Sequence, residues 1–464
     1  MSRRTMPQGT TQLTPGGRQA QQVFLSPANG DGGSYSANKS IYQLDFVLPD
    51  VDAFVSADYG FRLRGQIQCS YRPGNIPAGG NAFEDVFLSP SCGLHGMIKS
   101  VVITTSSNQV LERVQNYPRL ATHLLNASTN ANGICAHKQT EACMLGVLAD
   151  VSKVTGKQLN NSLIYANEIT NMNSRRFNFQ LETGISKGQQ DLGLRLHGGL
   201  RVQIELNNNM LFLFAPNSAT DIVAEQSVSN VDFAISDVTL EYTQVFMAPS
   251  MNMDMSAPGN ALPAASLMRG MDMDGTQVYQ SFSDSMVTVQ NSFNSASFAP
   301  GLPAVNMMLF NFLSTARVNG KSDPQSLDNF QLEKGQVMIN GERVSYFDQM
   351  SPIQLKLAGY EALGPWEVVS ASTTIDQRLG LFGIPVDTYT AGPNMLGSNR
   401  PQIEFSLSPT TLTEEAYKGA PISIQSFKKM AGNAPLAPSI MHVFFLGTRA
   451  VTPTPDGFVR SAVL

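Results

Sequence analysis

Apolar and polar side chains alternate with a period of two over several short stretches of this sequence, and this feature constrains the fold more than any other. The stretches lie at residues 44–48, 61–69, 177–181, 200–206 and 238–242. In one of them, Phe61, Leu63 and Ile67 alternate with arginine and glutamine. A period of two puts successive side chains on opposite faces of a strand. Each stretch therefore predicts a β-strand with one buried face, as in an antiparallel sandwich.

Strands resume in the second half of the chain, which predicts a second β domain. They are expected at residues 286–289, 307–312, 336–339, 403–407, 422–424 and 440–446. A chain of 464 residues exceeds what one hydrophobic core usually serves, so two domains of roughly 200 residues are expected. We divide the chain into a flexible N-terminal arm (1–37), a first domain (38–248), a connector (249–275), a second domain (276–451) and a C-terminal tail (452–464).

Residues 1–37 are expected to form an arm because they are rich in Gln, Gly, Ser, Thr and Pro and show almost no apolar periodicity. Such a segment cannot bury enough apolar area to offset its ordering entropy, so it is predicted to be disordered in a free monomer. Arg3, Arg4 and Arg18 outnumber the single acidic residue, Asp31. This positive balance makes the three arginines candidate assembly residues that contact an acidic partner or a membrane lipid.

Two helical patterns interrupt the first half. Leu120, Leu124 and Leu125 recur at helical spacing within residues 117–126, and residues 141–159 carry a second apolar face of this kind. Helical patterns do not alternate with the strands, so a parallel α/β fold is not expected. The sequence predicts an all-β protein with short helices inserted in long loops.

Composition bounds the class of function. Hydrophobic residues make up 42% of the chain and charged residues 14%, against about 25% charged residues in an average soluble domain. Such a low charge suits a protein whose outer faces are covered by identical neighbours. The formal net charge of -5 and the absence of a Lys/Arg run argue against specific nucleic-acid binding. No segment resembles a signal peptide or a membrane span, so we expect a soluble protein made in the cytosol.

Residues 184–188 match GxSxG, the nucleophile elbow of α/β-hydrolases, and Asp387 and His442 follow in the order that a catalytic triad needs. An elbow requires a strand before the serine and a helix directly after it. A Gly-rich segment that leads into a strand follows here instead. We therefore interpret Ser186 as part of a surface loop and assign no catalytic residue to the chain.

No metal or cofactor site is predicted. Cys135, His137 and Cys143 lack a fourth ligand and the spacing of a structural zinc site. The paired methionines of residues 251–273 could bind Cu(I), but they also suit irregular packing in a connector. The four cysteines are interpreted as buried apolar residues, and the singly placed histidines as core or loop residues.

Three segments resemble one family. Residues 93–117 (GLHGMIKSVVITTSSNQVLERVQNY), 198–209 (GGLRVQIELNNN) and 236–245 (SDVTLEYTQV) are similar to segments of the first jelly roll in major capsid proteins of Polinton-like viruses and virophages. These belong to the double jelly-roll lineage of large eukaryotic DNA viruses. The resemblance implies two consecutive eight-stranded antiparallel jelly rolls, each closing its sheets through two Greek keys.

The resemblance also implies a function. Three chains would form a pseudo-hexameric capsomer, and capsomers would tile the icosahedral shell of a tailless double-stranded DNA virus. Neighbouring capsomers, penton proteins and minor capsid or cement proteins would be the partners, and the virion the location. Three alternatives stay open: a carbohydrate- or receptor-binding spike, a minor capsid protein, and a β-sandwich glycoside hydrolase, which would need two carboxylates across a sugar cleft.

Overall fold

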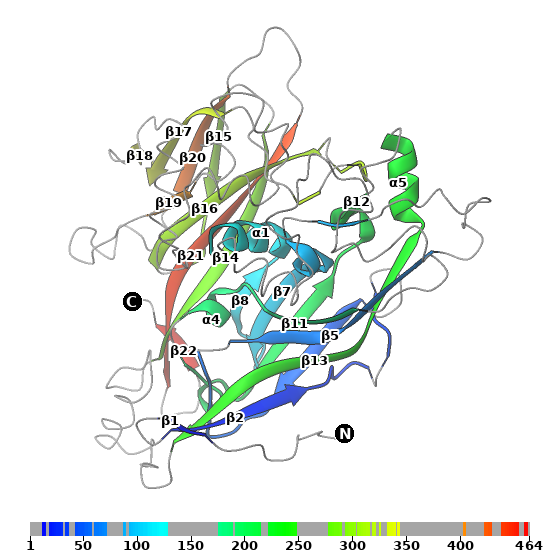
Figure 1. The fold of residues 1–464 in the computed structure, drawn as a ribbon. Coiled ribbons are helices and arrows are strands. Elements are labelled where there is room, and N and C mark those ends of the chain that lie inside the picture. The colour runs from blue at the N-terminus through cyan, green and yellow to red at the C-terminus, as the bar shows by residue number, and fades with distance from the viewer. Residues whose placement is uncertain are drawn as a thin grey trace, which may run out of the picture.

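The computed structural model is a β protein whose elements form two sandwiches (Figure 1). It describes residues 12–14, 18–30, 33–36, 42–57, 60–71, 87–89, 92–128, 175–188, 191–214, 221–247, 277–289, 293–302, 304–315, 318–321, 324–325, 332–339, 341–343, 402–404, 422–428, 438–453 and 459–462.

The first sandwich has eight main strands. In chain order they are β2 (Arg18–Leu25), β3 (Gln43–Leu48), β5 (Arg62–Tyr71), β7 (Ile98–Thr105), β8 (Val110–Val114), β9 (Arg175–Gln180), β11 (Leu200–Leu206) and β13 (Val231–Met247). One sheet has the order β2-β13-β5-β9 and the other the order β3-β11-β7-β8. Alternating apolar residues of the two sheets, such as Phe46 and Val202 of one and Leu63 and Phe179 of the other, are fully buried in one shared core.

The second sandwich also has eight main strands. They are β14 (Gln277–Val289), β15 (Phe293–Phe298), β16 (Ala304–Ser314), β17 (Leu332–Ile339), β18 (Glu342–Arg343), β19 (Gln402–Glu404), β20 (Ile422–Lys428) and β21 (Ser439–Pro453). One sheet has the order β14-β21-β16-β19 and the other the order β15-β20-β17-β18. This part of the chain therefore repeats the arrangement of the first.

The two sandwiches share one connectivity. If the eight main strands of each are counted along the chain, one sheet contains strands one, eight, three and six in that order. The other sheet contains strands two, seven, four and five. Antiparallel strands that cross between two sheets in this way form a jelly roll. The prediction of two consecutive jelly rolls is confirmed, and the duplication is structural, since the sequences of the halves do not repeat.

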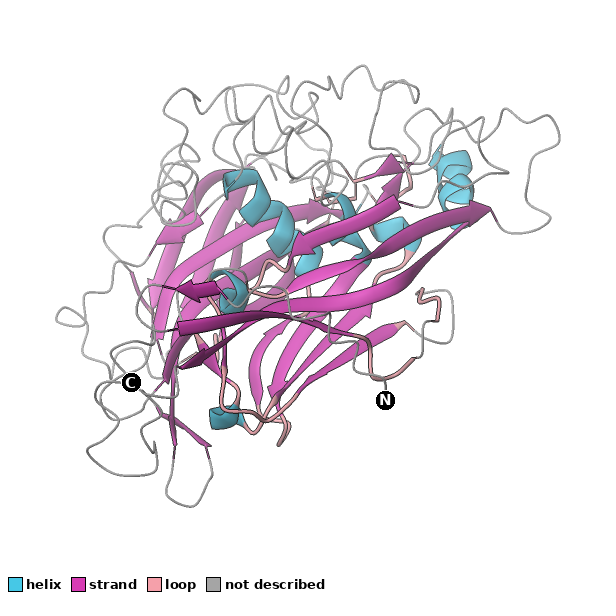
Figure 2. Ribbon diagram, turned by 60° about the horizontal axis from the view of Figure 1, so that its bottom comes forward, coloured by secondary structure: helices cyan, strands magenta, loops and turns pink. Residues whose placement is uncertain are grey.

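A single sheet runs through both jelly rolls. Strand β8 of the first pairs in parallel with β14 of the second at Arg113 and Ser283. This contact joins the sheet β3-β11-β7-β8 to the sheet β14-β21-β16-β19, and with β22 they form one nine-stranded sheet. In Figure 2 the strands, drawn in magenta, run across the described part of the molecule from one side to the other. Because β21 lies inside this sheet, both of its faces are covered. Phe444 and Leu446 pack into the core of the first jelly roll, whereas Val443 and Phe445 pack into that of the second.

Short elements complete the fold. Helix α1 (Tyr117–Ser128) confirms the first predicted helix, and its Leu120, Leu124 and Leu125 are buried as expected. The others are β1 (Gln12–Thr14), β4 (Phe54–Val55), β6 (Phe87–Leu88), η1 (Gly93–Met97), α4 (Gly184–Lys187), β10 (Leu192–Gly193), η6 (Arg195–His197), η7 (Asn209–Leu211), β12 (Leu213–Phe214), α5 (Asp221–Ser229) and β22 (Val459–Ala462).

Two segments assigned to flexible ends lie partly in sheets. Within the predicted arm, Arg18–Leu25 is the first strand of the first jelly roll and pairs with β13 over eight residues. Within the predicted tail, β22 pairs antiparallel with the end of β21. The arm assignment is wrong for β2 because backbone pairing holds the strand, with β13 along one edge and with β1 along part of the other, so that it needs few apolar side chains of its own. Its Val23 and Leu25 still contact the core.

Two further predictions fall on residues that the structure does not describe. The second predicted helix, at residues 141–159, and the connector, at residues 249–275, both lie outside the described residues. The strands that flank the connector end at Met247 and begin at Gln277. Within the described ranges, no helix combines the length and apolar character needed to cross a bilayer.

Candidate functional site at the junction of the two jelly rolls

Buried polar side chains join the two jelly rolls, and the side chain of Glu112 is central among them. Glu112 lies on β8 and is 1% exposed. Its Oε1 accepts hydrogen bonds from the backbone N–H groups of Gly184 at 2.6 Å and of Phe282 at 2.9 Å, and its Oε2 accepts one from Ile185 at 3.0 Å. The carboxyl group of Glu112 on β8 is thus hydrogen-bonded both to α4 of the first jelly roll and to β14 of the second.

The environment of Glu112 favours its neutral form. Burial raises the pKa of this carboxyl from 4.5 to about 7, while the three backbone hydrogen bonds and the positive charge of Arg449 oppose the rise. Desolvation is the larger effect because removing a carboxylate from water costs more free energy than hydrogen bonds from a few neutral N–H donors give back to the charged form. Glu112 therefore changes its charge near neutral pH, at the point where the two jelly rolls meet.

Asp284 of β14 makes the complementary contact. Its Oδ2 accepts hydrogen bonds from the backbone N–H of Asn116 at 2.8 Å and from that of Gln115 at 3.0 Å. The side-chain amide of Asn116 donates to the same oxygen at 2.8 Å. These donors lie between β8 and α1, where the chain leaves a strand and the backbone N–H groups have no ladder partner. Asp284 therefore fastens the start of α1 to the second jelly roll.

Gln277, the first residue of β14, inserts its amide into the first jelly roll. Its Nε2 donates to the backbone carbonyl of Asp191, and its Oε1 accepts from the backbone N–H of Gly193 at 3.1 Å. The Nε2 of His197 lies 3.2 Å from the same Oε1. Since an amide oxygen only accepts, His197 must donate there, which fixes its tautomer. Burial lowers the pKa of His197 to about 4, so the ring is neutral.

Arg119 of α1 makes a buried contact with the second jelly roll. Its guanidinium donates to Asn311 Oδ1 through Nε at 3.1 Å and Nη2 at 2.9 Å. The same group reaches the backbone carbonyls of Phe312 at 2.8 Å and of Gln325 at 2.9 Å. The planar fork of arginine suits several acceptors at fixed angles. The contact therefore sets how α1 sits on β16.

Histidines accompany this contact. Asn311 Nδ2 lies 3.0 Å from His123 Nδ1. His442 of β21 is 4% exposed, and burial, assisted by the charge of Arg119, lowers its pKa to about 3. Both rings lie in the core, as does His95, which confirms the interpretation of these histidines as core residues. Being neutral, His442 adds no further positive charge beside Arg119.

The GxSxG segment lies at this junction and not on the surface. Residues 184–187 form the single turn α4, and Gly184, Ile185 and Ser186 are buried. A Cβ added to Gly184 would lie 2.8 Å from Ser281 Cα, so β14 approaches the turn too closely for any side chain. The interpretation as a surface loop is wrong because these three residues are buried and the backbone N–H groups of Gly184 and Ile185 are hydrogen-bonded to the buried side chain of Glu112.

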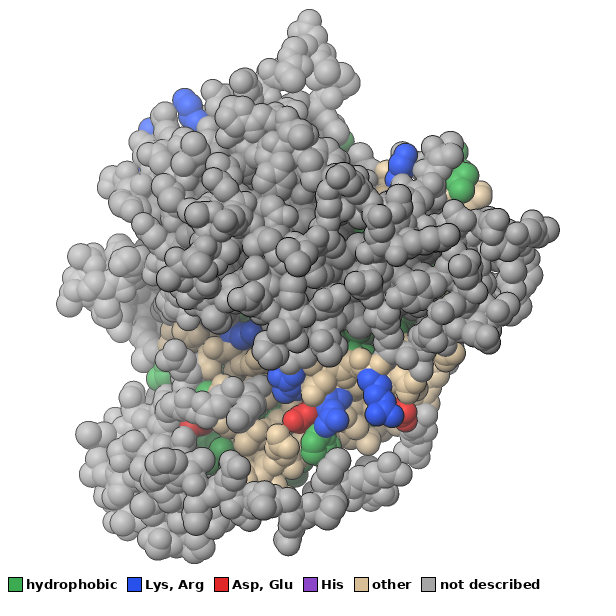
Figure 3. Space-filling model, viewed as in Figure 1, with side chains coloured by type: hydrophobic (Ala, Val, Ile, Leu, Met, Phe, Trp, Pro, Cys, Tyr) green, Lys and Arg blue, Asp and Glu red, His purple; other side chains and the backbone are tan. Residues whose placement is uncertain are grey.

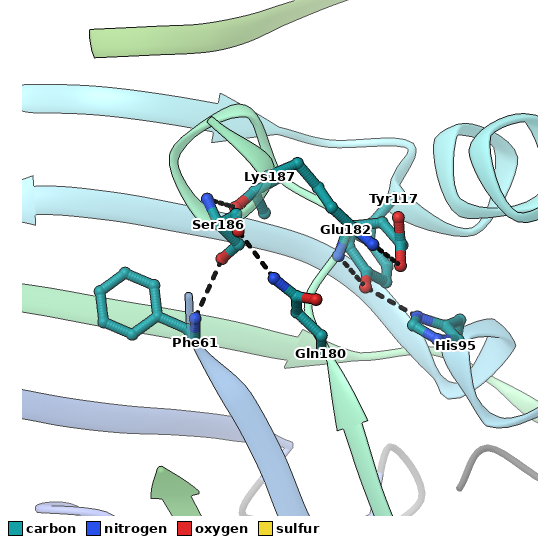
Figure 4. Close-up of polar contacts among 8 residues, drawn as sticks. Phe61, His95, Tyr117, Gln180, Glu182, Ser186 and Lys187 are labelled. Atoms are coloured by element: carbon teal, nitrogen blue, oxygen red, sulfur yellow. Dashed lines mark hydrogen bonds and ion pairs between the residues drawn. The ribbon is translucent and has the colours of Figure 1, made fainter. Parts of the chain in front are cut away.

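The contacts of Ser186 are structural. Its Oγ accepts a hydrogen bond from the backbone N–H of Phe61 at 3.3 Å, and its carbonyl accepts one from Gln180 at 2.7 Å. In the described part of the chain, no histidine hydrogen-bonds to this Oγ. Asp387, the acid expected for a triad, lies outside the described residues. The serine thus positions α4 against β5 and β9 (Figure 4).

A second polar cluster lies beside α4 (Figure 4). The hydroxyl of Tyr117 lies 2.8 Å from His95 Nδ1 and accepts a hydrogen bond from the backbone N–H of Glu182 at 2.9 Å. The carboxylate of Glu182 forms an ion pair with Lys187 at 3.0 Å. Burial, followed by the nearby charge of Glu182, raises the pKa of Tyr117 well above its ordinary value. The cluster ties the resembling segment 93–117 to the junction.

The residues singled out from the sequence lie elsewhere. Arg3 and Arg4 are outside the described residues, and Arg18 starts β2, where it pairs in register with Met247. Cys92 is buried, as interpreted, and forms no disulfide within the described residues. Cys135, His137, Cys143 and the methionines of residues 251–273 are not described. Within the described ranges, no group of three His, Cys, Asp or Glu side chains could hold a metal ion.

Sequence reasoning missed the junction residues. Glu112 and Gln277 stand singly in strand patterns, where a polar residue normally faces solvent. Only their contacts distinguish them, because their partners are 72 to 170 residues away in the chain. One weak signal exists: Gln277 and Ser281 alternate with the apolar Tyr279 at a period of two, so they share its buried face.

Comparisons with known proteins agree on the fold. No protein-family model and no curated protein sequence matches the chain. Among solved structures, the major capsid protein of Faustovirus is similar at 10% identity over 97% of this chain and 93% of that chain, with a TM-score of 0.54. A chain in the cryo-EM structure of the Sputnik virophage is similar at 11% identity over 99% and 91%, also with a TM-score of 0.54. The likeness spans both jelly rolls and identifies the chain as a double jelly roll.

Proposed function

We propose that this chain is the major capsid protein of a tailless double-stranded DNA virus, and that three copies form a pseudo-hexameric capsomer. The observation that carries the proposal is the repeated strand order, fused by a polar junction into one rigid unit. Three such units around a threefold axis present six similar sandwiches, which is the outline that a hexagonal lattice needs. The fold shared with the Faustovirus major capsid protein supports it.

The junction gives the proposal its physical basis. The shape of a shell depends on the shape of its subunits. The angle between the two jelly rolls of a subunit must therefore be fixed before neighbouring subunits bind to it. Glu112, Asp284, Gln277 and Arg119 each cross between the jelly rolls with buried or partly buried hydrogen bonds. Hydrogen bonds have narrow distance and angle limits, so these contacts restrict rotation more than apolar contact alone.

The remaining features of the proposal concern partners. The capsomer would meet neighbouring capsomers, penton proteins and minor capsid or cement proteins, and the protein would reside in the virion after synthesis in the host cytoplasm. Arg3 and Arg4, which precede the first described strand, would contact an acidic partner or an internal membrane. Arg18 is left out of this role because it begins a paired strand. The proposal assigns no catalytic activity, cofactor or specific nucleic-acid contact to the chain.

The test is the mass and shape of the purified full-length protein. Mass photometry is expected to find a trimer, and electron microscopy three-lobed particles with a near-hexagonal outline. A strictly monomeric chain at high concentration would contradict the proposal. The alternative of a carbohydrate- or receptor-binding spike predicts binding on a glycan array without assembly. A minor capsid protein would require a second protein to form particles.

A further inference from the structure

The described histidines gather at the contacts between the two jelly rolls. Four of the five histidines in the chain are described, and each is at most 4% exposed. In Figure 3 lysine and arginine side chains lie on the surface of the described part, whereas no histidine is visible there. Three of the four, His123, His197 and His442, lie beside a residue of the other jelly roll. We call these three residues the junction histidines.

The ring of His123, on α1, must accept a hydrogen bond through Nδ1. Arg119 donates to Asn311 Oδ1 through Nε and Nη2. Because a guanidinium only donates, this contact fixes the orientation of the Asn311 amide, and its Nδ2 faces the ring. Asn311 Nδ2 lies 3.0 Å from His123 Nδ1. A proton on Nδ1 would set two donors against each other, so this contact between α1 and β16 requires the nitrogen to be unprotonated.

His197, at the end of η6, is under the same constraint. Its Nε2 lies 3.2 Å from Gln277 Oε1, an acceptor, so the proton of the neutral ring is on Nε2. Its Nδ1 is buried and has no hydrogen-bond partner among the described residues. A second proton on this ring would therefore point into the interior without an acceptor.

His442 lies on β21 between β14 and β16. Met286 and Asn311 are its partners in the two ladders, so their side chains share one face of the sheet with the ring. Both ring nitrogens are buried, and neither has a hydrogen-bond partner in the described part of the chain. Arg119 of α1 contacts Asn311 on this face. A proton on His442 would place a second positive charge beside that guanidinium, away from water.

The charged and titratable groups on the surrounding elements do not favour protonated rings. Arg119, which faces His442, is itself a cation. Burial lowers the pKa of His197 to about 4, and burial with the charge of Arg119 lowers that of His442 to about 3. The other titratable groups make contacts of their own: Asp191 with the N–H of Ala57, Asp284 with those of Gln115 and Asn116, Arg195 with Asp52, and Tyr279 edge-on with the ring of His197.

We infer that the junction histidines form an acid-sensitive latch, in which protonation releases α1 and the segment β10–η6 from β14 and β16 while each jelly roll keeps its own fold. Neutral rings fit the closed junction, whereas protonated rings need water, and opening brings water to them. The opening is local, because Phe444 and Leu446 of β21 stay packed in the core of the first jelly roll. The inference concerns a single chain, so it goes beyond the proposed function and does not depend on it.

Glu112 opposes the latch. Its neutral form suits the closed junction, where burial outweighs the charge of Arg449 and raises its pKa to about 7. Between pH 6.5 and 4.5, His197 and His442 each raise the opening equilibrium by up to about tenfold per pH unit as the pH falls, and Glu112 offsets one of these factors. Acidification is therefore expected to favour the open junction by about tenfold per pH unit.

Hydrogen–deuterium exchange of the full-length protein at pH 6.5 and 5.5, corrected for intrinsic exchange, tests the inference. The reporters are the backbone N–H groups of Gln115, Asn116 and Gly193, each hydrogen-bonded to a side chain of the second jelly roll. They are expected to exchange about tenfold faster at pH 5.5, whereas the ladders β7–β11 and β17–β20 keep their protection. Reporters whose protection does not change, or ladders that lose protection to the same extent, would overturn the inference.

Single variants assign the effect to the junction histidines. His442→Phe keeps the bulk of the ring and removes its titration, so the change in reporter exchange should fall from about tenfold to less than about twofold. His197→Gln, which keeps a donor for Gln277 Oε1, should do the same and serves if His442→Phe does not fold. The control is His95→Gln, because His95 is also buried but contacts Tyr117 within the first jelly roll.

The control should retain the tenfold change of the wild type. A junction variant that retains it, or a control that loses it, would overturn the inference. The proposed function is decided separately, by the mass of the assembled protein.

Discussion

Glu112 and Asp284 are reciprocal acceptors across the junction of the two jelly rolls. Glu112, on β8 of the first, accepts the backbone N–H of Phe282 on β14, and Asp284, on that same β14, accepts the backbone N–H groups of Gln115 and Asn116, just after β8. Each strand thus supplies a carboxyl group to the other's backbone. A parallel contact of one residue pair alone would be weak, and the two carboxyl groups strengthen it.

Glu112→Ala is expected to lower the free energy of unfolding by about 4 kcal/mol. The change leaves three buried backbone N–H groups without their acceptor, at about 1 to 3 kcal/mol each before relaxation. We also expect the wild type to unfold in one transition and the variant in two, because β14 loses its hydrogen bond to Glu112 of the first jelly roll. Urea unfolding followed by fluorescence and circular dichroism measures both effects.

The matched control for this change is Glu205→Ala, also a strand glutamate. Glu205 is partly exposed and pairs with Lys99 on the outer face of the same sheet. Exposed pairs contribute about 0 to 1 kcal/mol. Equal losses in the two variants would show that Glu112 has no special role at the junction.

Gly184→Ala is expected to destabilise the protein by about 2 kcal/mol. The added methyl would sit 2.8 Å from Ser281 Cα and 2.9 Å from Ser281 N, which are backbone atoms of β14 and cannot turn aside. Thermal unfolding should show a lower melting temperature. Gly33→Ala, where no atom lies within 4 Å of the added Cβ, is the control and should change little. A variant as stable as the control would mean that α4 and β14 can separate freely.

Arg119→Lys should cost about 2 to 3 kcal/mol although the charge is kept. Lysine has one donor atom in place of the fork, so it cannot reach Asn311 Oδ1 and two backbone carbonyls together. Arg201→Lys, in a half-exposed pair with Asp45, should cost less than about 1 kcal/mol. Chemical unfolding of both variants gives the comparison, and a reversed ranking would exclude a positioning role for Arg119.

Acidification is expected to weaken the fold between pH 6.5 and about 4.5. Burial lowers the pKa of His197 to about 4 and of His442 to about 3, whereas the unfolded chain keeps the ordinary value of 6.5. Below pH 6.5 the unfolded chain therefore binds protons that the folded chain excludes, so stability falls as the pH falls. Each histidine removes up to about 1.4 kcal/mol per pH unit in this window.

Glu112 opposes this trend. Its pKa of about 7 in the fold lies above the ordinary 4.5, so its contribution is complete below pH 4.5 and is lost as the pH rises through 7. It offsets one histidine, which leaves a net loss of about 1.4 kcal/mol per unit on acidification. His442→Phe should make stability nearly independent of pH between 4.5 and 6.5. Unfolding curves at three pH values measure this, and an unchanged slope in the variant would contradict it.

Local structure and the presence of two β domains could be predicted from the sequence alone. Alternation at Leu44, Phe46 and Leu48 or at Phe177 and Phe179 requires strands with one buried face, because the period of two is set by backbone geometry. The leucines of α1 required a helix with one buried face for the same reason. Three short resembling segments added the expectation of two jelly rolls, which the strand order confirms.

The residues that join the jelly rolls, and the strand with which the first one begins, could be identified only from the folded chain. Strand β2 lacks a strong apolar pattern and exists because β13 offers it a partner edge. Glu112 and Ser186 have the chain neighbours of ordinary surface residues, yet both are buried by segments far away in the sequence. Burial of this kind depends on which distant strands come together, and the apolar pattern of one segment does not predict those contacts. Periodicity belongs to one segment of the chain, whereas a junction forms where two segments that are distant in the sequence come into contact.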